Sequence, residues 1–178
     1  MISSLKYDYI NENNVNEYRT PYFDKIFKTI NDSFLLTKEQ YNSWIVFQNE
    51  HIDCRVDKEN GRHKFGSNGG GSSLLFQINY CSEEMFPRIG FIGAKCEGCG
   101  KKDPLIKKYD DIKDLDKRYE YFQKYHFKFN LVEFYRFVEI YNEYKSTIEI
   151  SWMGMGLGDL VSIKVKDYVF DITDNSHW

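Results

Sequence analysis

The chain contains 178 residues, which predicts one domain, since domains usually span roughly 100–200 residues. Its hydrophobic content of 42% and charged content of 29% are typical of globular proteins and exclude an intrinsically disordered chain. A net charge of −3 excludes the basic surface of a nucleic-acid-binding protein. No apolar run approaches the roughly 20 residues that cross a bilayer. We therefore expect a globular domain that contacts neither nucleic acid nor membrane.

The first residues favour a cytoplasmic location. Residues 1–10 read MISSLKYDYI and lack the long apolar stretch of a secretory signal peptide. Proteins in the reducing cytosol rarely form disulfides. The four cysteines are therefore expected to be free thiols or metal ligands.

Periodicity and capping signals predict two helices near the N-terminus. Before these helices, residues 5–10 are compatible with a short strand. A helix is expected over residues 21–33, where apolar residues recur at helical spacing after a proline that suits a first turn. A second helix is expected over residues 37–50, because Thr37 can cap its start and Gln40 completes a capping box.

The rest of the chain alternates between strand and helix patterns. A hairpin turn is expected at Asn60-Gly61. Helices are expected over residues 114–126 and 130–145, the second with Asn130 as its N-cap. Strands are expected near residues 74–80, 89–94, 147–152, 161–165 and 168–172. This order predicts a single α+β domain over residues 1–178, with a mainly antiparallel sheet and about four helices.

The core is expected to form from apolar positions that repeat with the period of each element. The residues expected to be mostly buried are Phe27, Ile30, Trp44, Ile45, Phe76, Ile78, Phe134, Val138, Ile148 and Ile150.

The sharpest chemical signal is a repeated two-residue spacing between candidate metal ligands. Two residues separate Cys96 from Cys99, and Gly100 follows, so both thiolates can reach one tetrahedral Zn²⁺. His51 and Cys54 have the same spacing. The four side chains together would make a Cys₃His site, which predicts a structural zinc ion.

Two other interpretations of the cysteines stay open. Cys96 and Cys99 could be reduced structural thiols in a turn, or a redox pair, although no thioredoxin-like βαβ pattern surrounds them. Cys81 is a competing ligand. The metal content of protein purified without chelator would separate a zinc site from reduced thiols.

Two surface features are candidates for binding a partner. Carboxylates gather around the start of the helix expected at residue 114, where they could steer a basic partner; they are Asp110, Asp111, Asp114 and Asp116. Met153 and Met155 lie in a glycine-rich segment and offer adaptable apolar contacts. The other glycine cluster, at residues 66–71, lacks the Gly-Lys-Ser/Thr of a phosphate-binding loop.

One segment resembles the SUKH superfamily, the immunity-type proteins that neutralise toxins. The residues that carry the resemblance are Glu39, Tyr41, Trp44, Ile45 and Asn49, at the spacing of the family's helix motif. A glycine-rich stretch at residues 65–71 then precedes an apolar strand, as it does in that family. Lys38 and Glu50 stand where the family has proline and glycine. The resemblance covers residues 37–80 and implies toxin binding without catalysis.

These observations favour a non-catalytic cytoplasmic protein that binds and inhibits or neutralises another protein. An acidic inhibitor can be steered onto a basic partner, such as a basic toxin or a nucleic-acid-acting enzyme. One alternative is a zinc-stabilised structural or regulatory domain. Another is a small enzyme that uses a histidine or a cysteine, although no catalytic motif such as GxSxG is present.

Overall fold

The computed structural model describes residues 6–57, 62–63, 71–108, 113–125, 127–155 and 158–176. Four α-helices and a six-stranded antiparallel sheet make up most of this part of the chain, so the predicted α+β fold is confirmed. Among the described residues, none of the helices has the length and apolar character needed to cross a bilayer.

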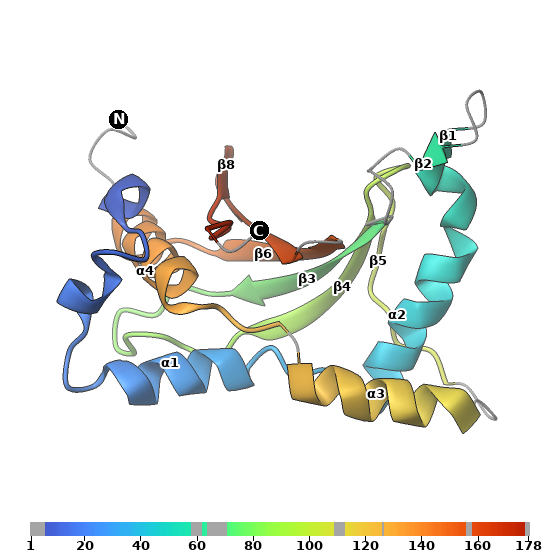
Figure 1. Cartoon of the computed structure of the whole chain (residues 1–178), viewed down its shortest axis with the longest axis horizontal. Helices are drawn as coiled ribbons and strands as arrows, with labels where there is room; N and C mark the ends of the chain where they lie inside the picture. Colours follow the sequence, from blue (N-terminus) through green and yellow to red (C-terminus); the bar gives the residue numbers. More distant parts are fainter. Residues whose placement is uncertain are drawn as a thin grey trace.

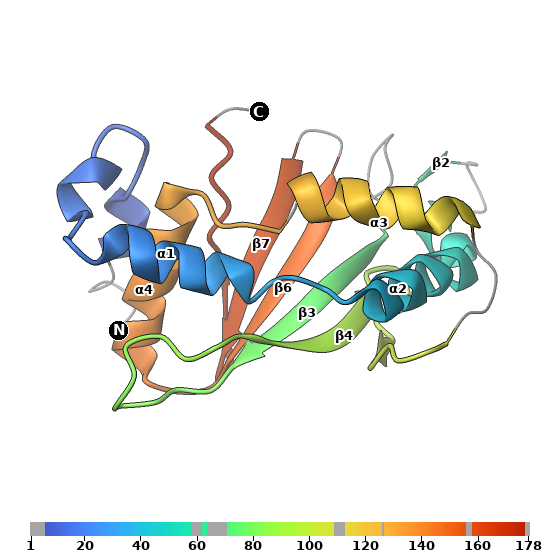
Figure 2. The same ribbon diagram turned by 90° about the horizontal axis from the view of Figure 1, so that it is seen from below.

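The six-stranded sheet has the order β5-β4-β3-β6-β7-β8 and is antiparallel throughout (Figures 1 and 2). Its strands are β3 (Ser72–Ile78), β4 (Gly90–Cys96), β5 (Lys102–Asp103), β6 (Ile148–Met155), β7 (Gly158–Val165) and β8 (Tyr168–Asp171). A separate two-stranded ribbon pairs β1 (Val56–Asp57) with β2 (Arg62–His63). The turn expected at Asn60-Gly61 lies outside the described residues, between these two paired strands.

The helices lie on one face and at the two ends of the sheet. They are α1 (Phe23–Asp32), α2 (Lys38–Glu50), α3 (Lys113–Tyr125) and α4 (Leu131–Tyr144). Helices α1 and α3 run below the sheet in Figure 1, while α4 and α2 stand at its left and right ends. The upper face of the sheet carries no helix over its middle (Figure 1). Residues that alternate with the core positions point toward this open face.

The capping signals in the sequence mark where α2 and α4 begin. Thr37 accepts a hydrogen bond from the backbone N–H of Gln40, and the Gln40 side chain accepts one from the N–H of Thr37. Asn130 and Glu133 form the same reciprocal pair at the start of α4. Both predicted capping positions are therefore confirmed.

The principal core is aromatic and lies between the sheet, α1 and α4. Phe34 packs edge-on against Phe76 and Phe129, with ring centroids 5.1 Å apart in both pairs. The Trp152 ring lies 4.3 Å from that of Phe34. All four side chains are fully buried, so the space between the sheet, α1 and α4 has a continuous apolar interior.

A second and smaller core lies at the right end of the sheet in Figure 1. Its fully buried members are Phe47, Ala94, Cys96 and Leu105. They join α2 to β4 and to the segment after β5. This small cluster surrounds one of the predicted metal ligands.

Some sequence predictions need correction. Residues 6–9 of the expected N-terminal strand form a 3₁₀ helix instead, because the side chains of the Asn-rich turn that follows bond to nearby backbone groups. Strand β6 continues to Met155 and β7 starts at Gly158, so the glycine-rich segment belongs largely to a hairpin.

The predicted core is confirmed at six of its ten positions, which are Ile30, Phe76, Ile78, Phe134, Ile148 and Ile150. The other four, Phe27, Trp44, Ile45 and Val138, are only half-buried. Trp44 and Ile45 line a cavity between helices, which explains their exposure. On α4, Phe137 and Ile140 are fully buried, so the buried face lies slightly to one side of the predicted stripe.

Candidate metal centre

The four predicted metal ligands converge at one point in the fold. One ligand atom from each of His51, Cys54, Cys96 and Cys99 lies within 4.8 Å of the other three. His51 and Cys54 follow helix α2, while Cys96 ends strand β4 and Cys99 lies in the turn between β4 and β5. Segments far apart in the sequence therefore bring together one imidazole and three thiols.

The end of α2 positions the first pair of ligands. His51 is the C-cap residue, and its ring packs against Phe47 with centroids 4.3 Å apart. The chain then turns into the 3₁₀ helix η4 (Ile52–Arg55), in which the Cys54 N–H donates to the His51 carbonyl at 3.1 Å. This turn places Cys54 Sγ 3.8 Å from His51 Nδ1.

The second pair lies on a tight turn that closes strand β4. The Cys96 N–H donates to the Lys101 carbonyl, and the Gly100 N–H donates to the Cys96 carbonyl. Gly100 has φ +77°, a conformation that glycine adopts without steric cost. The Cys99 N–H points at Cys96 Sγ at 3.5 Å, and Cys99 Sγ lies 3.5 Å from His51 Nδ1.

Gly98 makes the close approach of the two segments feasible. A Cβ atom at this position would lie 2.2 Å from the Cys54 carbonyl oxygen and 2.8 Å from Cys54 Cβ. No side chain fits in that space. The glycine inside the Cys96–Cys99 spacing is therefore required for the turn to reach the segment after α2, which the sequence analysis did not recognise.

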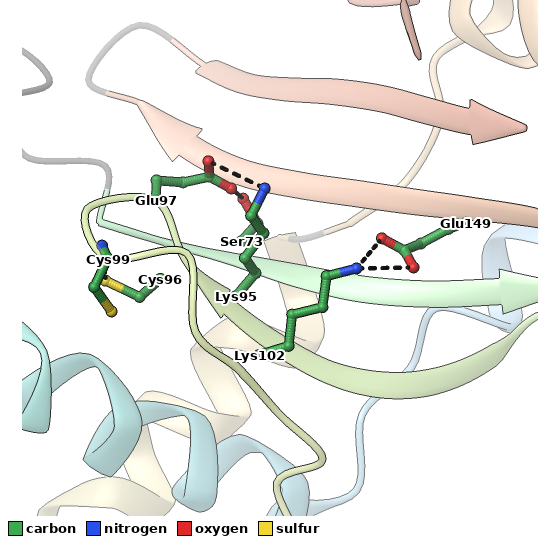
Figure 3. A network of polar contacts seen from close by, with 7 residues as sticks. All are labelled: Ser73, Lys95, Cys96, Glu97, Cys99, Lys102 and Glu149. Carbon is green, nitrogen blue, oxygen red and sulfur yellow. Dashed lines mark hydrogen bonds and ion pairs between the residues drawn. The ribbon is translucent and has the colours of Figure 1, made fainter. Parts of the chain in front are cut away.

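Polar contacts on the other side of the turn hold it against the sheet. Figure 3 shows the Glu97 side chain pointing away from the two cysteines. Its carboxylate accepts a hydrogen bond from Ser73 Oγ and lies 4.0 Å from Lys95 Nζ. Farther along, Lys102 Nζ reaches Glu149 of β6 at 3.0 Å (Figure 3). These contacts fix the turn from the open face of the sheet.

The surroundings act differently on the individual thiols. The pKa of the Cys99 thiol is lowered, chiefly because the Lys101 backbone N–H hydrogen-bonds to its sulfur. The pKa of the Cys54 thiol is raised, chiefly by desolvation. Cys96 is fully buried, whereas Cys99 is exposed. The turn therefore provides one sulfur from the interior and one at the surface.

The donor set and its spacing fit a tetrahedral metal ion. A Zn–S bond of about 2.3 Å implies sulfur–sulfur separations of about 3.8 Å around zinc. Separations of up to 4.8 Å among these ligand atoms need only a small contraction to reach that geometry. N–H groups directed at cysteine sulfurs also stabilise thiolates. The site can thus hold a divalent metal with four protein ligands.

The remaining cysteine lies away from this cluster. Cys81 follows the opposite end of β3, and its backbone N–H and carbonyl both contact the hydroxyl of Tyr141. It is not one of the clustered ligands. A ligand set that includes Cys81 is therefore not the one that the fold brings together.

Only some of the candidate partner-binding residues lie in the part of the chain that the structure describes. Asp116 is exposed on α3 and pairs with Lys38 at 2.6 Å. Asp114 belongs to α3, but its side chain, like all of Asp110 and Asp111, lies outside the description.

The two candidate methionines are both in strand β6. Met153 is half-buried and pairs with Leu160 of β7. Met155 pairs with Gly158, and its side chain lies outside the description. Both residues therefore belong to a paired strand of the β6–β7 hairpin.

A cavity that sequence patterns did not reveal lies between α2 and α3. It has a volume of about 590 Å³, and Tyr41, Trp44 and Phe122 form part of its wall. The only sequence signal for it was the high aromatic content, 17% of the chain, which does not locate a cavity.

Comparisons of the chain with family models, curated proteins and solved structures give no match. The function must therefore be inferred from the fold and from the geometry of the side chains.

Proposed function

We propose that the chain is a zinc-stabilised binding domain, in which one Zn²⁺ joins the end of α2 to the β4–β5 turn. The observation that carries the zinc site is the convergence of His51, Cys54, Cys96 and Cys99, whose ligand atoms lie within 4.8 Å of one another. Both ligand pairs have the two-residue spacing common in structural zinc sites.

The donor chemistry favours zinc in a structural role. Three thiolates and one imidazole are soft and borderline ligands, which select Zn²⁺ over Mg²⁺ or Ca²⁺. Four protein ligands complete a tetrahedral shell and leave no coordination position for a substrate or a reactive water. The ion would therefore stabilise the fold, and its binding energy would contribute directly to folding.

Metal content tests this proposal. Protein purified without chelator should contain one zinc ion per chain, and Cys96→Ser or Cys99→Ser should lose it. Cys81→Ser is the matched control, because it removes a thiol outside the cluster and should keep the metal. A content below about 0.2 zinc per chain in the unmodified protein would exclude a closed four-ligand site.

We further propose that the domain binds another protein without catalysis, as an inhibitor or immunity-type protein. The open face of the sheet supports this, because no helix lies over its middle (Figure 1) and side chains of its outer strands β7 and β8 are exposed, whereas Ser73 and Leu75 of the central strand β3 are buried. Val169 of β8 is 68% exposed, and Lys164 of β7 and Asp171 of β8 are exposed near it. The resemblance of residues 37–80 to the SUKH superfamily is consistent with toxin neutralisation.

The partner expected is a protein with a basic surface, such as a toxin or a nucleic-acid-acting enzyme. Asp110, Asp111, Asp114 and Asp116 are the proposed steering residues, and they predict association that slows as salt concentration rises. Candidates captured from the native host should be purified and titrated against the chain. Val169→Asp should weaken a complex that uses the open face, whereas Tyr22→Asp, an exposed change beside α1, should not. Equal binding by both variants would exclude the open face.

A further inference from the structure

The cavity between α2 and α3 has the size and lining of a small-molecule site. Its volume of about 590 Å³ falls within the roughly 300–1,000 Å³ typical of ligand pockets. Aromatic rings supply much of its surface, including those of Trp44 from α2, Phe122 from α3 and Phe127 from the segment before α4. Such flat apolar walls suit a planar ring system.

The aromatic walls are held in place by contacts outside the cavity. Trp44 Nε1 donates a hydrogen bond to Ser72 Oγ at 2.9 Å, which fixes the indole against β3. The Phe122 ring lies 4.6 Å from that of Tyr41 and 5.3 Å from that of Phe127. A ligand would therefore enter a largely preformed site and order few side chains on binding.

Hydrogen bonds also fix the position of α3 beside α2. The Tyr119 hydroxyl and Gln123 Nε2 both donate to the Leu36 carbonyl, at 3.1 and 3.0 Å. Lys38 and Asp116 add an ion pair between the same two segments. The spacing between the two helical walls is therefore determined by specific contacts.

Charged groups from two different elements face the cavity. Lys117 and Arg118 line it from α3, and Asp159 lines it from β7. Within the described residues, the Asp159 carboxylate has neither a hydrogen bond nor an ion pair. Asp159 is exposed, and desolvation by its surroundings still raises the pKa of its carboxylate. A carboxylate in that position favours a ligand that donates hydrogen bonds.

The balance of these charges selects the class of ligand. Two cations against one carboxylate disfavour a cationic ligand, although aromatic walls alone would suit one. Lys117 and Arg118 instead suit an anionic group such as a phosphate. A planar base that carries N–H donors on one edge would satisfy Asp159 while its faces contact the aromatic rings.

We propose that this cavity binds a purine nucleotide, with the base among the aromatic rings, its N–H donors on Asp159 and its phosphate at Lys117 and Arg118. Guanine is favoured over adenine, since its N1–H and N2–H groups lie side by side and can both donate to one carboxylate. The site is separate from the zinc ligands, so it does not depend on the metal proposal.

Calorimetric titration of the full, metal-replete chain with guanosine monophosphate tests the proposal. Guanosine monophosphate should bind about tenfold more tightly than cytidine monophosphate, and inorganic phosphate alone should bind more weakly than either. No binding at about 1 mM guanosine monophosphate, which corresponds to roughly −4 kcal/mol, would overturn it. Equal affinity for the guanine and cytosine nucleotides would also overturn it.

Matched charge variants locate the ligand. Asp159→Asn and Lys117→Gln should each raise the Kd about tenfold, the scale of one lost charge-assisted hydrogen bond. Asp167→Asn and Lys28→Gln are exposed changes outside the cavity and should leave the Kd unchanged. Parallel zinc content and melting temperature would show that each variant is folded. Unchanged binding by folded Asp159→Asn and Lys117→Gln proteins would place the nucleotide elsewhere and overturn the assignment.

Discussion

The two ends of the molecule are held together by different means. At the α4 end, α1 and α4 pack on the sheet around a large aromatic core that includes Phe34, Phe129 and Trp152. At the α2 end, only Phe47, Ala94, Cys96 and Leu105 form the fully buried cluster. A cluster of that size buries little apolar surface, and it includes Cys96, one of the candidate metal ligands. With the proposed zinc site, burial alone would stabilise the α4 end, while the α2 end would also depend on the metal cross-link.

The largest expected effect comes from truncating the principal core. Phe134 is 2% exposed, and its ring contacts those of Phe23 and Phe27. Phe134→Ala should lower the free energy of unfolding by about 3–5 kcal/mol, whether or not zinc is bound. Chemical denaturation measures this loss, and Val169→Ala, an exposed control, should stay within about 0.5 kcal/mol. A loss below about 1 kcal/mol would show that this core does not carry the stability of its end.

The next effect is a pH dependence that originates at the α4 end. Burial is the main cause that raises the pKa of Glu133 to about 7, although two backbone N–H groups donate to its carboxylate. The folded protein therefore favours the protonated form of Glu133. The contribution of this group to the free energy of unfolding is fully present below about pH 4.5 and is lost as the pH rises through 7.

Glu133→Gln should remove that dependence. Relative to the unmodified protein, the variant should gain up to about 3 kcal/mol of unfolding free energy between pH 4.5 and pH 8, since one pKa unit corresponds to about 1.4 kcal/mol. Acid also displaces zinc, but that loss is common to both proteins and cancels in the difference. A difference that stays constant with pH would show that Glu133 ionises normally in the folded state.

A smaller change should affect the α2 end selectively. Gly98→Ala would place Cβ 2.2 Å from the Cys54 carbonyl oxygen, so the β4–β5 turn must move away from η4. We expect a loss of about 1–3 kcal/mol and weaker zinc binding. Gly90→Ala is the control on the same strand, because the nearest atom to its Cβ is 3.8 Å away. Competition with a chromogenic chelator would compare the two affinities, and equal values would refute the role of Gly98.

The smallest effect is expected on the open face. Lys102 bridges β5 to Glu149 of β6 at 3.0 Å, but 49% of the lysine side chain is exposed. Solvent screens such a pair, so Lys102→Met should cost no more than about 1 kcal/mol. Thermal unfolding at low and high salt would measure it. A larger loss of stability that does not depend on salt would mean that this contact stabilises the α2 end by more than a solvent-screened ion pair can.

Local signals in the sequence predicted the parts of this fold that depend on neighbouring residues. Thr37 and Asn130 start helices because their side chains satisfy backbone N–H groups within the same turn. The metal ligands were predicted because each pair lies within one turn of chain. The sequence could not show that the His51–Cys54 pair and the Cys96–Cys99 pair would meet. The fold brings the two pairs together.

Features that depend on distant contacts were not predictable in the same way. The strand order places β3 between β4 and β6, and the pairing of β3 with the distant β6 results from packing rather than from a local pattern. Trp44 has the spacing of a core residue, yet it lines a cavity because α3 stands across from it. The sequence showed Asp159 at the end of a glycine-rich segment but not its place in this cavity, because the other lining residues come from distant elements. Periodicity identifies an apolar face but not what lies opposite it.

Hydrogen exchange measured segment by segment, with and without a zinc chelator, tests most directly whether a metal cross-link holds the α2 end. The account predicts that chelation removes protection from residues 47–54 and 94–103 and leaves β6 and α4 protected, since the principal core does not contain the ion. Cys81→Ser should behave like the unmodified protein in both conditions. Unchanged protection at the α2 end after complete removal of zinc, or an equal loss across both ends, would contradict it.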